Sequence, residues 1–432
     1  MTREPIEDRL ARAGLSPLAR TAWLEVSLDA LRDNLAALRA AAGEGVRVEP
    51  VVKADAYGHG AVPVALELQD AGADGLSVAT LDEAYELREG GVTLPVLVLY
   101  PIPATQVDAA ARAHVATSIG PGVLGARILA AAERAFRDGA PPLEVHVEVE
   151  TGLGRGGALP GEVGTLVEQV RRSPGVRLGG VWTHLAAAND PRYSGEQDRR
   201  FGGAIAPLDD AVTWGGGPDE VRRHTAGSGG VLGAAVARRE AARTGLAIYG
   251  LVPDGLVPAA ATAPAAALLR PVLSLHVRPV RVVDLPAGHG VSYGPVFFTA
   301  QPARIATLPV GYGDGWQRIL TDRASALVRG VRVPLVGRVA MDAVMADVTG
   351  VPGPPVTEDD EFVLLGEQGP GRITVLELAS AGGTISYEIV TGMSRRLARV
   401  YDRAGSVISV RTLTGGRPEW LASSSGTGIS AT

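Results

Sequence analysis

The chain has 432 residues, which exceeds the usual size of a single domain and favours two domains. Its residues are 46% hydrophobic and 20% charged with a net charge of −6, and no Lys/Arg-rich stripe or apolar run of about 18 residues occurs, which argues against nucleic-acid-binding and membrane-spanning proteins. The absence of cysteine excludes disulfides, thiol nucleophiles and zinc–thiolate sites. Residues 1–5 show no signal pattern, so a cytoplasmic location is expected.

The two ends of the chain contain little that could be buried. We expect residues 1–20 to form a loose N-terminal extension and the Gly/Ser-rich residues 411–432 to form a flexible tail. Inside them, Ser27 can cap a helix that ends before Gly43 and whose apolar face is formed by Leu28, Leu31, Leu35 and Leu38.

Short apolar runs then alternate with helical patterns up to about residue 255. The helical patterns include 61–71, 81–89 and 195–208. The strand candidates are 48–53, 75–79, 95–100, 115–119, 143–150, 178–184, 221–225 and 245–249. Eight strands at fairly even spacing favour a (β/α)₈ barrel of the TIM type over a doubly wound sheet, which is the competing interpretation.

The pattern changes near Pro264. Residues 270–410 are rich in Val and in turn signals, and helical periodicity is scarce until Tyr387–Tyr401, which predicts a mainly β domain. The α/β fold expected is therefore an N-terminal barrel at 21–262 and a C-terminal β domain at 263–410, with the segment near 21–27 able to pair with the C-terminal domain.

Polar residues gather where the barrel strands are predicted to end, which is where barrel enzymes place their chemistry. Lys53 ends the first strand and could act as a Schiff-base amine, although a lysine there is more often simply solvated. In the fifth strand, Glu148 and the residues at every second position from it share one face of the strand. That face would point into the barrel, where the carboxylates would need a compensating cation such as Arg155. The alternative is an edge strand with a solvated face.

Tyrosine placement also indicates a ligand site. Four of the nine tyrosines, at positions 57, 249, 293 and 312, directly precede a glycine, which lets backbone approach a ligand while the phenol points at it. Phenols, Ser228 and backbone N–H groups could hold a phosphate in this way. His184, at the end of the sixth strand, is by itself better explained as a buried structural histidine than as a ligand-binding residue.

At these residues the sequence resembles the alanine racemases, from about residue 22 to 402. The motif Val52-Lys53-Ala54-Asp55-Ala56-Tyr57-Gly58-His59-Gly60 is similar to the family's cofactor-lysine motif and is highly specific. Further segments resemble family motifs in the family's order: 151–155, 183–186, 224–228, 243–250, 291–294, 311–315, 336–342 and 384–388.

The resemblance implies a homodimer with shared active sites that interconverts L- and D-alanine with pyridoxal 5′-phosphate (PLP), in which Lys53 carries PLP as a Schiff base and no metal takes part. Lys53 and Tyr293 would be the two acid–base residues on opposite faces of the substrate, with Tyr293 from the partner subunit. The residues implied to surround the cofactor are Tyr57, His184, His224, Ser228, Arg243, Gly245, Leu246 and Tyr387. The residues implied to bind the substrate are Arg155, Met341 and Tyr312, with Glu148 and Asp342 in support.

Three positions depart from the family pattern. Glu148 stands where many relatives have a lysine, often carbamylated, and a carboxylate can orient Arg155 directly. Ala340 replaces a common cysteine and Gly227 a common asparagine, which affects the substrate pocket and the phosphate-side loop rather than the two acid–base residues.

Other interpretations belong to different classes. A barrel-fold PLP-dependent amino-acid decarboxylase would usually contribute a cysteine, and a PLP-carrying regulatory protein would lack the C-terminal β domain. A racemase of serine or another small amino acid is the nearest alternative.

Overall fold

The computed structural model describes residues 4–215, 217, 220–233, 236 and 238–414. Within these residues the chain divides into two compact units: Ala30–Arg270 forms one, and the residues on either side of it form the other. No helix in the described part of the chain is both long and apolar enough to cross a membrane.

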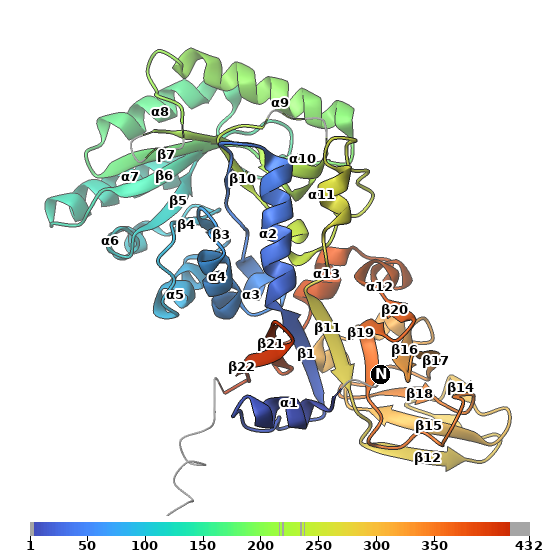
Figure 1. Ribbon diagram of the computed structural model, residues 1–432. Coiled ribbons are helices and arrows are strands. Elements are labelled where there is room, and N and C mark those ends of the chain that lie inside the picture. The colour runs from blue at the N-terminus through green and yellow to red at the C-terminus, as the bar shows by residue number, and fades with distance from the viewer. Residues whose placement is uncertain (1–3, 216, 218–219, 234–235, 237, 415–432) are drawn as a thin grey trace, which may run out of the picture. The chain divides into compact units, whose positions relative to one another are not determined.

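The unit at 30–270 is a closed ring of parallel strands with helices outside it, as Figure 1 shows for β5, β6 and β7. Its strands are β2 (Arg47–Val48), β3 (Leu76–Val78), β4 (Val96–Val98), β5 (Val115–Ile119), β6 (Leu143–Glu148), β7 (Val176–Trp182), β8 (Arg222–His224), β9 (Ala226–Gly227) and β10 (Ala241–Arg243). Six strands pair in the order β3 to β8, β10 pairs with both β9 and β2, and a bridge from Val51 to Ser77 joins the β2 segment to β3. Because β9 continues β8 after a single residue, the ring closes with eight strand positions, which confirms the barrel over the doubly wound sheet.

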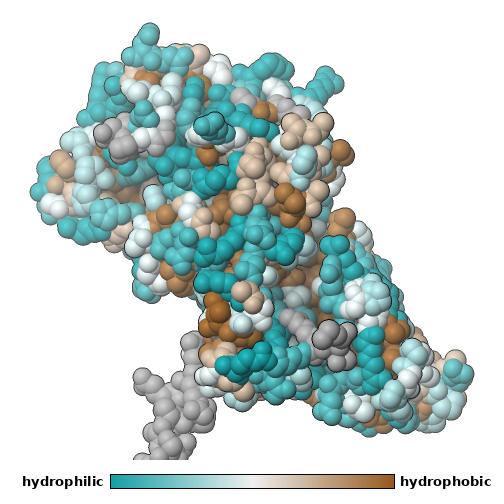
Figure 2. All heavy atoms as spheres, viewed as in Figure 1, coloured by the Kyte–Doolittle hydropathy of each residue, from teal (hydrophilic) through white to brown (hydrophobic). Residues whose placement is uncertain are grey.

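Helices cover the outside of this ring. They are α2 (Leu28–Ala42), α4 (Ala61–Asp70), α5 (Leu81–Glu89), α6 (Val107–Arg112), α7 (Gly122–Arg137), α8 (Val163–Arg172), α9 (Pro191–Ile205), α10 (Ser228–Leu232) and α11 (Ala263–Ala267), with single 3₁₀ turns η1 (Ala104–Gln106), η2 (Pro160–Glu162) and η3 (Ala206–Leu208). Each longer helix buries one stripe; α8, for example, buries Val163, Leu166, Val167 and Val170. The visible surface is largely hydrophilic, with apolar residues gathered over the segment around α11 (Figure 2).

The eighth strand expected at 245–249 is wrong. The last barrel strand is β10, and Leu246–Tyr249 forms the 3₁₀ helix η4. All four residues of η4 are fully buried, and an apolar run of this length gives the same pattern as a buried strand. Gly245, with φ −96° and ψ −103°, ends the extended backbone.

The second unit is mainly β, as expected. Its strands are β1 (Ala22–Ser27), β11 (Leu273–Val277), β12 (Arg281–Leu285), β13 (Gly290–Val291), β14 (Phe297–Phe298), β15 (Ala303–Leu308), β16 (Ser325–Val328), β17 (Val331–Val336), β18 (Val344–Asp347), β19 (Phe362–Gln368), β20 (Gly371–Ile373), β21 (Ala398–Arg403) and β22 (Ser406–Arg411). Eleven of them form one sheet, in which β1 lies between β11, its antiparallel neighbour, and β21, its parallel neighbour. The unit also contains the helices α1 (Ile6–Arg12), α12 (Val375–Gly382) and α13 (Ser386–Thr391) and the 3₁₀ turns η5 (Tyr312–Asp314) and η6 (Arg318–Leu320).

Two expectations for this unit need correction. Residues 1–20 are not simply loose, because α1 buries Ile6 and Leu10 against a cluster that includes Trp23 and Val400. A helix of seven residues is too short for its periodicity to stand out in sequence. The helical pattern expected up to Tyr401 ends with α13, and the strand β21 follows because it pairs with β1 and β22. Most of the predicted tail, 415–432, lies outside the described residues.

Candidate active site

Lys53 begins a left-handed turn of the backbone. The segment α3 (Lys53–Tyr57) follows the β2 segment, and its residues Ala54, Asp55, Ala56 and Tyr57 have φ of 52°, 56°, 53° and 52°. A left-handed turn costs roughly 1–2 kcal/mol for each residue that carries a Cβ atom, so the surrounding structure must hold it in place.

Hydrogen bonds with the next two helices stabilise this turn. Glu83 of α5 accepts hydrogen bonds from the backbone N–H of Ala54 (2.6 Å), Ala79 (2.8 Å) and Thr80 (3.1 Å). Asp55 accepts from the N–H of Ala61, the first residue of α4, at 2.9 Å. The turn therefore presents the side chains of Lys53 and Tyr57 from fixed backbone positions.

The Lys53 amine lies in an electropositive environment. Its side chain is half-buried, and burial together with the charges of Arg155 and Arg243 lowers its pKa from 10.5, against the opposing effect of Glu83. A lowered pKa increases the fraction of neutral amine, which is the form that attacks a carbonyl group.

A group of hydroxyls and glycine backbone lies at the same end of the barrel. A Cβ atom built on Gly245 would lie 2.6 Å from the Tyr57 hydroxyl, so the glycine lets this phenol sit against the backbone at the start of η4. Ser228, the first residue of α10, accepts a hydrogen bond from the N–H of Ala247 at 3.1 Å. Together with the Lys53 amine, this donor set fits a phosphorylated aldehyde such as PLP.

Arg243 ends β10 and is fixed by three hydrogen bonds. Its Nη1 contacts Nδ1 of His224 at 2.5 Å and the carbonyl of His224 at 2.9 Å, and its Nη2 donates to the carbonyl of Thr183 at 2.8 Å. Its guanidinium also lies 4.5 Å from the centre of the Trp182 ring. Burial lowers its pKa to about 10, which still leaves it protonated at neutral pH.

His184 lies just beyond β7 at the barrel mouth, which is the end formed by the carboxyl ends of the strands. Desolvation by the surrounding protein and the charges of Arg243, Arg155 and Lys53 lower its pKa to about 3, so its imidazole is neutral near pH 7. Gly227 leaves space beside it, because a Cβ atom there would meet nothing closer than 3.6 Å.

Arg155 is oriented by two neighbours. Its Nη2 donates to Glu148 Oε1 at 3.3 Å, and its guanidinium lies 5.5 Å from the centre of the Tyr100 ring. Burial raises the pKa of Glu148, whereas the charge of Arg155 and its hydrogen bond lower it; the net effect is a raised pKa.

The predicted residues of the C-terminal unit also lie together. Tyr293, Tyr312, Met341 and Asp342 line one cavity of about 550 Å³. Their side chains are open to solvent, with Tyr293, Tyr312 and Met341 exposed to 76%, 45% and 52%. Asp342 bonds to Arg396 at 2.7 Å. Tyr387 lies on α13 and is half-buried.

Two residues that support these groups, Glu83 and Tyr100, were not predicted from the sequence. Glu83 has a sequence signal, since Thr80 and Glu83 form a capping box at the start of α5. That signal does not predict that the second carboxylate oxygen reaches Ala54, because this contact joins separate segments.

Comparison with known proteins accounts for both units. Models of the alanine racemase N-terminal domain and C-terminal domain match residues 26–253 and 272–401. Together they cover well over half of the chain. The chain belongs to the alanine racemase family.

Individual alanine racemases are similar to this chain over nearly their whole length. An alanine racemase of Symbiobacterium thermophilum is 41% identical over 88% of this chain and 97% of its own length. An alanine racemase of Desulfosudis oleivorans is 38% identical over 89% of this chain and 98% of its own length. Among solved structures, alanine racemase from Bacillus anthracis with bound L-Ala-P has a TM-score of 0.80 at 34% identity, covering 92% of this chain and 99% of that one. Alanine racemase from a D-cycloserine-producing Streptomyces lavendulae has a TM-score of 0.79 at 34% identity, covering 90% and 98%.

Proposed function

We propose that this protein interconverts L- and D-alanine, with PLP carried on Lys53 and with Lys53 and Tyr293 as the two acid–base residues. The observation that carries the proposal is the position of Lys53 at the start of the left-handed turn, which Glu83 holds in place at the barrel mouth. Burial and the charge of Arg155 lower the pKa of the Lys53 amine there. Membership of the alanine racemase family supports the choice of reaction and substrate.

The reaction requires a proton to leave one face of the α-carbon and another to arrive on the opposite face. PLP, when bound, would supply the electron-withdrawing system that makes the substrate's Cα–H acidic enough to ionise. Two acid–base side chains on opposite faces are then sufficient, since each removes a proton in one direction of the reaction and returns one in the other.

Lys53 suits one of these roles, because its lowered pKa increases the fraction of neutral amine, which is the form that can accept a proton. Tyr293 suits the other role, because its phenol is largely exposed beside Tyr312 and Met341 and is accessible to a bound substrate. We propose that it is supplied by the partner subunit of a homodimer. The open cavity that these three residues share supports this assignment.

Binding of the substrate carboxylate would fall to Arg155 and the backbone N–H of Met341. Glu148 and Tyr100 limit the freedom of the Arg155 side chain, so less orientational entropy is lost when a carboxylate binds. Tyr57, Ser228 and the backbone at Gly245 would hold the cofactor's phosphate, with Tyr387 contributing from α13.

Arg243 would face the cofactor's ring nitrogen. A guanidinium with a pKa of about 10 donates hydrogen bonds at neutral pH but does not accept a proton. Arg243 would therefore leave that nitrogen unprotonated, whereas a carboxylic acid in its place would supply a proton. His224 and Thr183 hold the guanidinium in position.

The proposal is tested by incubating the purified protein with L-alanine, L-serine and basic L-amino acids in deuterium oxide. We expect D-alanine carrying deuterium at Cα, with much slower turnover of the larger substrates. Reduction with borohydride followed by peptide mass spectrometry should place a pyridoxyl group on Lys53. A label on another residue, or release of carbon dioxide from a basic amino acid, would contradict the proposal.

A further inference from the structure

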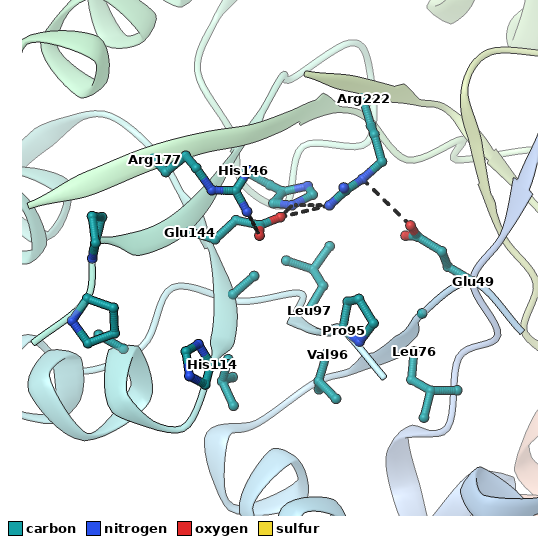
Figure 3. Close-up of a pocket in the computed structure, with 16 residues that line it drawn as sticks. Glu49, Leu76, Pro95, Val96, Leu97, His114, Glu144, His146, Arg177 and Arg222 are labelled. Carbon is teal, nitrogen blue, oxygen red and sulfur yellow. Dashed lines mark hydrogen bonds and ion pairs between the residues drawn. The ribbon is translucent and has the colours of Figure 1, made fainter. Parts of the chain in front are cut away.

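Three buried side chains, those of His146, His224 and Arg243, continue a row that starts at the half-buried Glu144. The row runs through the barrel interior, from Glu144 near its floor to Arg243 at its mouth. The floor is the end formed by the amino ends of the strands. Glu144 Oε1 lies 3.0 Å from His146 Nε2, His146 Nδ1 lies 2.9 Å from His224 Nε2, and His224 Nδ1 lies 2.5 Å from Arg243 Nη1. Figure 3 shows the floor end of the row, where Glu144 and His146 meet Arg222.

The chemistry of the two ends determines which atoms carry protons. A guanidinium only donates, so the Nδ1 atom of His224 must accept from Arg243 and carries no proton. A neutral His224 then has its proton on Nε2 and donates it to Nδ1 of His146. His146 in turn has its proton on Nε2 and donates it to the Glu144 carboxylate, which only accepts.

Arg222 does not reverse this direction. Its Nη2 lies 2.7 Å from Glu144 Oε1 and 3.2 Å from His146 Nε2, so it could also donate to that imidazole. In that case His146 would donate to His224 from Nδ1, and the proton of His224 would face the N–H of Arg243 at 2.5 Å. Two donors facing each other at this distance repel, so Arg222 is instead a second donor to the Glu144 oxygen.

The surroundings keep both imidazoles neutral and Glu144 ionised. His146 and His224 are 1% and 0% exposed, and burial lowers the pKa of each, with the charge of Arg243 a further cause for His224. Burial alone would raise the pKa of Glu144, but its bond to His146 and the charges of Arg222 and Arg177 bring it below its ordinary value. Glu49 faces Arg222 from the opposite side at 3.6 Å (Figure 3).

We propose that Glu144 and His146 are positioning residues for Arg243, because they hold His224 in the tautomer whose Nδ1 lone pair fixes the guanidinium. The tautomer follows from the residues of this row alone. Its consequence for catalysis rests on the proposed function, in which Arg243 faces the cofactor ring. The carboxylate at the barrel floor would then control the orientation of a cation at the mouth without touching cofactor or substrate.

The tautomers can be measured directly by ¹⁵N nuclear magnetic resonance on holoenzyme labelled at histidine, since protonated and unprotonated ring nitrogens have well separated shifts. Asn variants of His146 and His224 would assign the signals. We expect both residues to be neutral with the proton on Nε2. A proton on Nδ1 of His224, or a doubly protonated ring in either residue, would overturn the proposal whatever the activity of the enzyme.

Kinetics of variants test the consequence. His146→Leu removes the acceptor for His224, and we expect kcat to fall about 10- to 100-fold while KM for alanine, set by Arg155, changes little. His146→Gln should restore most of kcat, because an amide oxygen can accept from His224 while the amide nitrogen donates to Glu144. Arg177→Gln is the matched control, since Arg177 also contacts Glu144 but lies outside the row.

The outcomes separate the two proposals. If the wild type does not racemise alanine, the proposed function fails, but the ¹⁵N spectrum still decides the tautomers. If His146→Leu keeps His224 protonated on Nε2 and keeps kcat equal to that of Arg177→Gln, the positioning role is refuted. If the leucine variant does not fold, the wild-type spectrum and the glutamine variant decide.

Discussion

Arg155 shows how one residue acquires a role through its neighbours. An exposed arginine after a strand has many possible orientations, and each costs side-chain entropy to select. Here the buried Glu148 carboxylate accepts from it at 3.3 Å, and the Tyr100 ring lies beneath the guanidinium. The unmodified Glu148 side chain thus provides the anion that orients Arg155.

Removing the charge of Glu148 should weaken substrate binding more than it affects the chemical step. For Glu148→Gln we expect KM for alanine to rise about tenfold with little change in kcat, because a charge-assisted hydrogen bond is worth about 1.5–3 kcal/mol. Steady-state kinetics measure this, with Glu168→Gln on the exposed face of α8 as the control.

The same residue predicts a pH dependence. The pKa of Glu148 is raised, so its carboxylate gains a proton at a higher pH than an ordinary glutamate. As the pH falls through that pKa, the wild-type KM should rise towards the KM of Glu148→Gln, while the variant's own KM stays flat over the same range. Parallel profiles for the two enzymes would show that Glu148 is only structural.

At the scale of elements, the strained left-handed turn after Lys53 is held by hydrogen bonds from α4 and α5. Its conformation is unfavourable for alanine, and it persists because Glu83 accepts from the N–H of Ala54 and because Asp55, within the turn, accepts from the N–H of Ala61 in α4. The site therefore depends on the packing of these elements as much as on the residues of the motif.

Strain in this turn can be measured by replacing alanine with glycine in the turn and, for comparison, in an ordinary helix. Ala54→Gly should stabilise the protein by about 0.5 kcal/mol, since glycine removes the left-handed penalty but adds entropy to the unfolded chain. Ala130→Gly, on the exposed side of α7, should destabilise it by about 1 kcal/mol. Denaturant unfolding of both variants would show opposite signs, and a loss of stability in both would mean that the turn is not strained.

The contact between η4 and the left-handed turn should control cofactor affinity. In Gly245→Ala the new Cβ atom would lie 2.6 Å from the Tyr57 hydroxyl, so the phenol must move. We expect the Kd for PLP, measured by absorbance titration, to rise about tenfold or more. Gly202→Ala on α9 introduces a Cβ atom with no neighbour within 4 Å and should leave the Kd unchanged.

At the scale of the whole molecule, the candidate catalytic residues are divided between two units. Lys53 belongs to the barrel, and Tyr293 lies in an exposed cavity of the mainly β unit. If a homodimer completes each site with Tyr293 from the partner, neither unit of a single chain is sufficient for racemisation.

Mixing two inactive variants tests this arrangement. Lys53→Ala and Tyr293→Phe should each abolish racemisation, and subunit exchange between them should restore about a quarter of wild-type activity, because half of the dimers are hybrids with one intact site. If both residues of a site came from one chain, every hybrid would remain inactive. Separate incubation of each variant, without exchange, is the control.

Period and composition were sufficient to predict the barrel and the mainly β unit, because they report local structure and burial. The candidates Lys53, Arg155 and Tyr293 were assigned their roles by the resemblance of their motifs to those of the family. The eighth strand was misplaced, since a buried 3₁₀ turn and a buried strand have the same apolar pattern. Helix α1 was missed because it is stabilised by contacts with distant residues such as Val400.

Tertiary structure alone decided how the site is supported. Glu83 beneath the left-handed turn, Tyr100 beside Arg155 and the row from Glu144 to Arg243 join residues from different strands and loops. Sequence patterns record which face of an element is buried, but the partner of a buried charge depends on how the strands close around it. The candidates for the reacting groups could therefore be named from the chain, whereas the orientation and protonation of the side chains around them depended on the closed barrel.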